Sequence, residues 1–366
     1  MAINQGLAAV SSDCTIAALL IYSLGVLAFA GDLAFGRPHR VAAAKAEVRA
    51  RAAELATVGA AASSSAALSP AGPDVDAADA GDAPADAREP GPSAGVTALP
   101  ARRLPLLAAI REAGPWMQAA VALSVLGVSV HLVAVVTRGL AAHRAPWGNM
   151  YEFVTALTCV AAIFFVYVMV RYRAWALGIW VMGAVVLALG LAETVIYTAA
   201  GPLVPALQSY WLSIHVTAMT LATGIFFVAA VLGILYLVAE RYRARVAAGK
   251  AAGGNGLLER IPTREQLDKL TYRTVIFGFP VWTFGVIAGA IWADEAWGRY
   301  WGWDPVETWA FITWVLYAAY LHARATAGWR GRRAHYIQLI GFASLVVNIL
   351  VIQVFVTGMH SYAGVS

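Results

Sequence analysis

Residues 213–239, SIHVTAMTLATGIFFVAAVLGILYLVA, form a run of 27 residues without Asp, Glu, Lys or Arg. A helix needs about 20 mostly apolar residues to cross the hydrocarbon core of a bilayer. Other stretches share this character, and the eight segments lie near 15–35, 116–137, 152–170, 174–198, 213–239, 273–292, 307–325 and 336–357. The sequence therefore predicts an all-α, polytopic membrane helix bundle with about eight transmembrane helices.

The composition of the chain agrees with this fold class. Of its 366 residues, 60% are hydrophobic and 13% are charged, whereas soluble globular proteins have about 25% charged residues. Cys14 and Cys159 form neither a CxxC nor a CxxCH motif, so the chain is not itself a c-type cytochrome. The net charge of +5 is typical of basic membrane loops, and we expect no nucleic acid partner.

The distribution of basic residues predicts the orientation in the membrane. The loops 37–111, 171–173, 241–273 and 324–333 carry 23 of the 26 Lys and Arg residues, and the opposite side carries only Arg138, Arg144 and Arg299. The positive-inside rule assigns the basic side to the cytoplasm. We therefore expect a multi-pass protein of the cytoplasmic (inner) membrane with both termini extracytoplasmic.

The chain divides into three parts by composition. Residues 1–36 contain the first predicted span, and residues 116–366 contain the other seven. Between them, residues 37–115 comprise a basic helical arm and an insertion rich in Ala, Asp and Pro, residues 57–100. This insertion has too little apolar mass to offset the entropy of ordering, so we expect it to be disordered.

The most informative loop lies between the sixth and seventh predicted spans, WADEAWGRYWGWDPVETWAF (292–311). Four tryptophans fall within residues 297–309, around an Asp304-Pro305 turn. One interpretation is an aromatic belt at the lipid interface, where tryptophan is enriched. The other is a concave aromatic shelf for a large flat ligand. The clustering favours the shelf, and the belt stays open on composition alone.

Two histidines lie at the same predicted surface as this loop. His215 begins the fifth span at its outer end, and His360 follows the eighth span at its outer end. A neutral imidazole is an axial ligand of haem iron. Either histidine alone is most simply an interfacial residue. Two of them beside an aromatic shelf indicate a bis-histidine haem site.

The segment WGRYWGWDPVETWAFITWVLYAAYLHAR (297–324) resembles the tryptophan-rich "WWD" signature of haem-handling proteins. Its WDPVETW and YLHAR portions are similar to the CcsA/ResC family (sometimes labelled CcsB) of system II cytochrome c biogenesis. Three further segments agree: HRAPWGNMYEF (143–153), YWLSIHVTAM (210–219) and TGMHSYAG (357–364). The resemblance covers residues from about 116 to the end and does not include the insertion.

This resemblance implies a function. Members deliver haem b across the membrane and, with a ResB-type membrane protein, attach it to the CxxCH motifs of apocytochrome c. The chain would be the haem-binding subunit of a holocytochrome c synthase complex. Two alternatives stay open: a CcmC-like haem delivery protein without synthase activity, and a b-type membrane cytochrome in electron transfer.

The resemblance also implies site residues. His215 and His360 would ligate the outer haem, and His322 would ligate a haem inside the membrane. Beside the outer haem, Trp297, Trp301 and Trp303 would support the macrocycle, and Asp304 would fix the loop or a haem edge. We expect no protein nucleophile, because thioether formation needs mainly positioning of the reactants.

The second ligand of the inner haem is not evident in this chain. His322 lies about 22 Å below the outer surface and His131 about 10 Å, at 1.5 Å per residue. These depths do not suit one haem unless its plane lies nearly parallel to the membrane, so we expect the second ligand to come from the ResB-type partner. His131 is then a buried polar residue, although an ionisable group at that depth is a functional candidate by default.

Other polar residues carry weaker expectations. The outer arginines Arg138, Arg144 and Arg299 are candidates for pairing with haem propionates. The segment 147–152 either caps the third span through Asn149 or walls the haem pocket. We expect no chemistry from His39 and His335, which lie in basic loops.

Overall fold

The computed structural model describes residues 2–36, 106–202, 207–250, 257–326 and 328–360. The chain forms two units, residues 37–114 and the remainder. In the first of these units only the short helix α3 (Leu106–Glu112) is described. The predicted basic arm and the insertion 57–100 therefore lie outside the described residues, as does His39.

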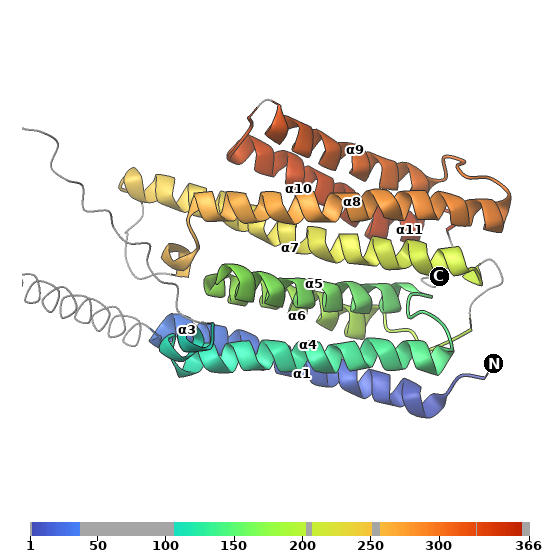
Figure 1. Ribbon diagram of the computed structural model, residues 1–366, viewed down its shortest axis with the longest axis horizontal. Helices are drawn as coiled ribbons and strands as arrows, with labels where there is room; N and C mark the ends of the chain where they lie inside the picture. The colour runs from blue at the N-terminus through green and yellow to red at the C-terminus, as the bar shows by residue number, and fades with distance from the viewer. Residues whose placement is uncertain (1, 37–105, 203–206, 251–256, 327, 361–366) are drawn as a thin grey trace, which may run out of the picture. The chain divides into compact units, whose positions relative to one another are not determined.

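Within the larger unit, the described residues form long helices and no strand (Figure 1). The helices α1 (Gln5–Phe35), α4 (Pro115–Ala142), α5 (Met150–Tyr172) and α6 (Gly178–Val195) form the first half. The second half comprises α7 (Tyr210–Ala247), α8 (Arg264–Trp297), α9 (Pro305–Ala325) and α10 (Arg332–Val347), which continues through a π-helical turn (Asn348–Ile352) into α11 (Gln353–Phe355). Each of the eight predicted segments coincides with one of these helices, which confirms the predicted fold class.

Seven of the described helices are long and apolar enough to cross a membrane, and α9 is not among them. The sequence predicted a span at 307–325, where α9 lies. This helix contains Glu307, His322 and Arg324, and many of its other residues are Trp, Tyr and Thr. Such residues lower its hydropathy, although α9 packs against α8 and α10 as a member of the bundle.

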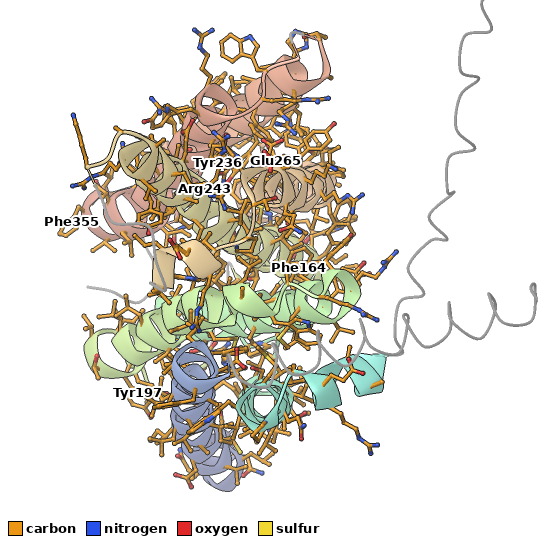
Figure 2. All side chains as sticks on the ribbon, turned by 90° about the vertical axis from the view of Figure 1, so that its left-hand side faces the viewer. Phe164, Tyr197, Tyr236, Arg243, Glu265 and Phe355 are labelled. Carbon is orange, nitrogen blue, oxygen red and sulfur yellow. The ribbon has the colours of Figure 1, made fainter. Side chains whose placement is uncertain are left out.

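Helices that follow one another within each half run antiparallel, whereas α5 and α7 run parallel (Figure 1). The pairs α1–α4 and α7–α8 have the most extensive contacts, and α5 joins the two halves by packing on both α4 and α7. Figure 2 shows the bundle end-on, from the end opposite the 298–304 segment. Arg243 and Glu265 lie at this near end. The start of α1 and the end of α11 both lie at the end of the bundle that carries this segment.

Small residues allow the helices to approach closely, as is usual where lipid tails remove the hydrophobic driving force for helix association. A side chain at position 127 would overlap the ring of Tyr22 on α1. In the second half, the rings of Phe226 and Tyr317 stack with their centroids 3.8 Å apart. The stacked pair joins α7 to α9, and the ends of α7 to α10 near the 298–304 segment carry the predicted site.

Two histidines outside that site are fully buried. His131 on α4 places its Nδ1 3.4 Å from the hydroxyl of Tyr22. His335 was expected in a basic loop, but it lies in the first turn of α10, stacked on Tyr236 with its Nε2 3.4 Å from a carboxylate oxygen of Asp268. The short connection of residues 326–331 explains the difference, because α10 begins earlier than hydropathy indicated.

Candidate functional site

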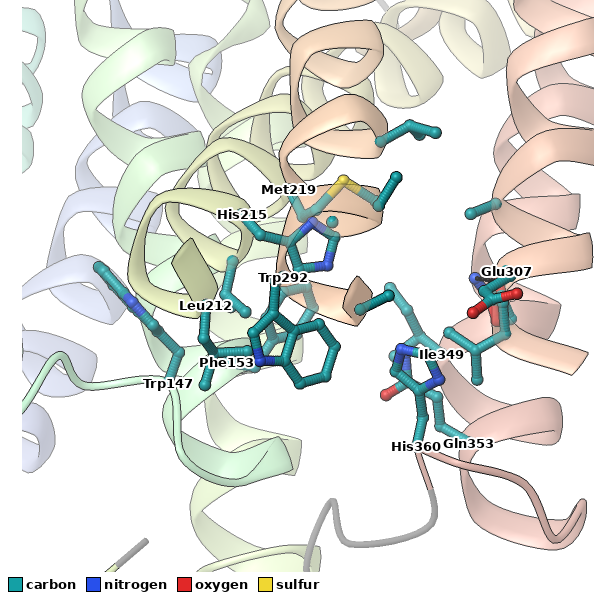
Figure 3. Close-up of a pocket in the computed structure, with 18 of the residues that line it drawn as sticks. Trp147, Phe153, Leu212, His215, Met219, Trp292, Glu307, Ile349, Gln353 and His360 are labelled. Carbon is teal, nitrogen blue, oxygen red and sulfur yellow. Dashed lines mark hydrogen bonds between the residues drawn. The ribbon is translucent and has the colours of Figure 1, made fainter. Parts of the chain in front are cut away.

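A large cavity opens at the end of the bundle that carries the 298–304 segment (Figure 3). It comprises about 1,210 Å³ of space between the atoms, part of it open to the surroundings. Its walls come from the 147–153 segment, α7, α8, the 300–310 segment, the α10–α11 region and His360.

His215 lies on α7 and lines this cavity. Its Nδ1 donates a hydrogen bond to the carbonyl of Gly285, 2.7 Å away on α8. Because a carbonyl only accepts, Nδ1 carries the proton and Nε2 carries the lone pair. Residue 289 is glycine, and a side chain there would overlap the imidazole. The backbone of α8 therefore fixes both the tautomer and the position of His215.

His360 lies beyond the end of α11 and lines the same cavity. Its Nδ1 is 2.8 Å from Oδ2 of Asp304. Since the carboxylate accepts, Nδ1 donates, and in the neutral ring the lone pair is on Nε2. A histidine whose Nδ1–H is held by a carboxylate or a backbone carbonyl is typical of histidines that bind metals through Nε2.

Asp304 is buried and acts outside the cavity wall. Its carboxylate caps α9 at the N–H of Val306, 3.3 Å away, and accepts the N–H of Met359 at 2.7 Å. Burial acts to raise the pKa of Asp304, but the hydrogen bonds from His360 and the Met359 N–H outweigh it and hold the pKa below its ordinary value. Asp304 therefore ties the C-terminal segment with His360 to the start of α9.

Trp292 is the aromatic residue that joins the two histidines. Its ring stacks on that of His215 with centroids 6.0 Å apart, and it meets that of His360 edge-on at 5.7 Å. Trp297 completes the group, 4.8 Å from Trp292 and 5.1 Å from His360 between centroids. Sequence reasoning did not single out Trp292. The feature that could have indicated it is its position on α8. It lies about one helical turn beyond Gly289, on the face of α8 that contacts His215.

The predicted shelf tryptophans divide into two groups. Trp297 and Trp301 line the cavity. Trp303 does not: it has a left-handed φ of 57° and its side chain is 67% exposed. Its ring is edge-on to those of Trp301 and Phe311. The 298–304 segment is therefore partly a cavity wall and partly an exposed aromatic surface.

The outer arginines are engaged with carboxylates. Arg138 and Arg144 bind the buried Glu152 at 2.9 and 2.6 Å, and neither lines the cavity. Arg299 lies over the ring of Trp297, 5.7 Å from its centroid, and its Nη1 is 3.4 Å from Glu307. Of the three candidates for propionate pairing, Arg144 and Arg299 each lie beside a residue of the cavity wall, Gly148 and Trp297 respectively.

His322 lies away from this cavity. It belongs to the last turn of α9, about 26 Å along the helix from Pro305 at 1.5 Å per residue. Its side chain is exposed on the face of α9 that also exposes Phe311 and Val315. The structure thus brings His215, His360, Trp297, Trp301 and Asp304 together, and leaves His322 and Trp303 on the outer surface of the bundle.

The arrangement has a definite chemical capacity. Two imidazoles, each with its Nδ1 held by an oxygen acceptor, line one aromatic cavity, and the described residues contain no cluster of three or more His, Cys, Asp or Glu that would hold a bare metal ion. A flat aromatic ligand that brings its own metal fits such walls, because stacking binds the plane and nitrogen binds the metal.

Comparisons with known proteins agree with this chemistry. The sequence model of the family described as "Cytochrome C assembly protein" matches residues 147–360. The cytochrome c biogenesis protein CcsA of Heterosigma akashiwo is 36% identical over 245 residues, covering 59% of this chain and 76% of that protein. The CcsA protein of Gloeobacter violaceus is 33% identical over 319 residues, covering 72% of this chain and 89% of that protein.

Among solved structures, one named "Cytochrome c Heme Lyase CcmF" matches 67% of this chain and 43% of that chain. The TM-score is 0.47 at 18% sequence identity, which is too low to establish a common fold.

Proposed function

Because the chain belongs to the cytochrome c assembly protein family, we propose that it holds haem b in the outer cavity and presents it for attachment to the CxxCH motif of apocytochrome c. The observation that carries this proposal is the pair His215 and His360. Each imidazole has its Nδ1 held by an oxygen acceptor, and both line one tryptophan-walled cavity. The haem is the substrate of the reaction.

The reaction adds a cysteine S–H across a haem vinyl group: sulfur bonds to one carbon, hydrogen goes to the other, and the double bond becomes single. No atom is lost and no electron acceptor is needed. The contribution of the protein is to position the two reactants, which is worth about 7–11 kcal/mol in well-oriented systems. His215 and His360 fix the haem, and Trp297 and Trp301 support its ring.

His322 has a separate role in this proposal. It ligates a second haem inside the membrane, and its other axial ligand comes from a ResB-type partner. The exposed position of His322 supports this assignment, because its own bundle offers no facing histidine among the described residues. The aromatic and aliphatic side chains of Phe311 and Val315 extend the same surface.

The orientation is a part of the proposal. The basic loops lie in the cytoplasm, and the cavity faces the outside of the cytoplasmic membrane, where apocytochrome c is found after export. Haem then passes from the His322 region to the outer cavity.

The decisive experiment is haem transfer. The haem-loaded protein, purified with its ResB-type partner, is mixed with a reduced CxxCH peptide, and haem that resists acid-acetone extraction is measured on the peptide. We expect covalent haem on CxxCH but not on a SxxSH peptide. Retained haem without covalent product would instead favour a delivery protein or a b-type cytochrome.

A further inference from the structure

Two loops at the rim of the cavity have the same spacing of key residues. One is RAPWGNMYE (144–152), before α5, and the other is RYWGWDPVE (299–307), before α9. In each nine-residue stretch the first residue is Arg, the sixth is Asn or Asp, and the ninth is Glu. Each also contains a Trp-Gly pair between the Arg and the Asx residue.

The glutamates make the same contacts in both loops. Glu152 accepts the N–H of Gly148 at 2.8 Å and binds Nη1 of Arg144 at 2.6 Å. Glu307 accepts the N–H of Gly302 at 2.9 Å, and its Oε1 lies 3.4 Å from Nη1 of Arg299. Each glutamate therefore fixes the peptide that follows a tryptophan.

In both loops the head group of an arginine lies against the glycine. A side chain at Gly148 would overlap the guanidinium of Arg144, and one at Gly302 would overlap that of Arg299. The guanidinium groups thus lie against the backbone in the space that a Cβ would occupy. A loop held by a carboxylate on one group and covered by an arginine has little freedom to move.

The Asx residues set the helix starts. Asn149 caps α5 by accepting the N–H of Glu152 at 2.9 Å, and Asp304 caps α9 at Val306. Such caps are worth about 1 kcal/mol each and fix where a helix begins. The two loops therefore share one arrangement, which we call the Arg–Glu lock. The glutamate binds both the arginine and the N–H of the glycine, and so holds the tryptophan that precedes the glycine.

The loops differ by one tryptophan, and this difference shows which tryptophan of the first loop corresponds to which of the second. The second loop has Trp303 between glycine and the Asx residue, and its left-handed φ of 57° turns this residue outward. Trp147 therefore corresponds to Trp301, and both line the cavity. In Figure 3, Trp147 and Glu307 lie on opposite sides of the open space.

We propose that the 144–152 loop is a second haem-binding wall, with Trp147 as a ring-contacting residue and Glu152 as the positioning residue that holds it. This inference rests on the proposed function and adds to it a ligand contact outside the tryptophan-rich loop. The substrate it selects is a large flat ring that two separately held tryptophans of the cavity wall contact. An aromatic wall on one side only would leave the other edge of the ring in contact with water.

The test measures haem retained per protein after purification of the full chain with its partner. The variants are Trp147→Leu, Trp301→Leu and, as a matched control, Trp329→Leu, a half-exposed tryptophan of the α9–α10 connection. We expect Trp147→Leu and Trp301→Leu each to retain about tenfold less haem, the effect of losing one stacked ring. Trp329→Leu retains the wild-type amount.

A second set of variants tests the lock. Gly148→Ala and Gly302→Ala force the guanidinium out, and we expect both to lower retained haem. The control Gly183→Ala, where a methyl group meets nothing within 4 Å, leaves it unchanged. Trp147→Phe keeps an aromatic ring, so we expect it to retain more haem than Trp147→Leu. If Trp147→Leu does not accumulate, Trp147→Met, a flexible apolar replacement, takes its place with the same expected loss.

The outcomes separate the two proposals. Normal haem in Trp147→Leu and Gly148→Ala, together with a loss in Trp301→Leu, would overturn the second wall and leave the proposed function intact. Absence of haem from the wild-type complex would overturn both.

Discussion

A histidine acts as a metal ligand only when its tautomer and direction are fixed, and in this protein two different acceptors do so. The Gly285 carbonyl holds Nδ1 of His215, and the Asp304 carboxylate holds Nδ1 of His360. The first acceptor belongs to a transmembrane helix and the second to a loop. We therefore expect His360 to be the more easily disturbed of the two, because its position depends on one side chain.

Asp304→Asn tests that dependence. Asparagine caps helices nearly as well as aspartate, so α9 should persist while the charge-assisted bond to His360 is lost, at about 1–2 kcal/mol. We expect less retained haem in Asp304→Asn at normal protein levels. An absorption spectrum and haem content identical to wild type would contradict the role of Asp304.

The pH dependence of stability follows from the same carboxylate. Because its folded pKa lies below the ordinary value of about 3.9, Asp304 stabilises the native chain above that pH and loses this contribution as pH falls through the depressed pKa. Thermal unfolding of the detergent-solubilised protein should therefore weaken more steeply below about pH 4 in wild type than in Asp304→Asn. Parallel curves for the two proteins would show that Asp304 is not stabilised as a carboxylate.

Trp301 and Trp303 differ in their positions, although the sequence placed both on the shelf. We expect Trp301→Ala to reduce retained haem by about tenfold and Trp303→Ala to leave it nearly unchanged, because Trp303 is 67% exposed and outside the cavity. Haem quantified in the two purified variants decides this. A larger loss in Trp303→Ala would mean that the exposed ring contacts haem directly.

Single residues also show where sequence reasoning ends. His215, His360 and Trp301 were predictable because their residue types and predicted helix ends place them on one surface. Trp292 was not, since its contact with both histidines depends on the rotation of α8 about its axis. Likewise, the outward turn of Trp303 comes from one left-handed φ angle, which neither hydropathy nor spacing reveals.

At the scale of helices, glycines on α8 determine how closely α7 approaches. Position 289 lies against the imidazole of His215, and position 285 lies against Met219 and supplies the carbonyl that binds Nδ1. The helix pair α7–α8 is thus the rigid half of the site. The helices themselves were predictable from apolar runs, but α9 was less apolar than expected of a span.

Gly289→Ala tests the rigid half. The added methyl group would overlap the His215 ring, and such overpacking costs about 1–3 kcal/mol. We expect lower thermal stability and less retained haem, both measured on the purified protein. Gly190→Ala, whose methyl group meets only one atom at 3.9 Å, serves as the control. Equal haem content in the two variants would show that α8 does not position His215.

At the scale of the whole molecule, the start of α1 and the 298–304 segment, whose Tyr300 and Trp301 line the cavity, lie at one end of the bundle. The charge distribution predicts that this end faces the outside. A reporter fused to the N-terminus or inserted at 298–304 should therefore read as extracytoplasmic, and one within 60–100 as cytoplasmic. A cytoplasmic signal at 298–304 would overturn the proposed route of haem.

The central claim is that His215 and His360 ligate iron in the outer cavity whereas His322 acts elsewhere, and imidazole rescue tests it most directly. Each histidine is changed to Ala in the protein co-expressed with its ResB-type partner, and haem content, the low-spin spectrum and mature cytochrome c are measured with and without added imidazole. We expect imidazole to restore all three in His215→Ala and His360→Ala, because the cavity is open and the missing ligand is a neutral nitrogen. His322→Ala should lose haem and recover poorly, since in the proposed function its site lies against lipid and the partner. Wild-type haem and maturation in both His215→Ala and His360→Ala, without imidazole, would contradict the claim.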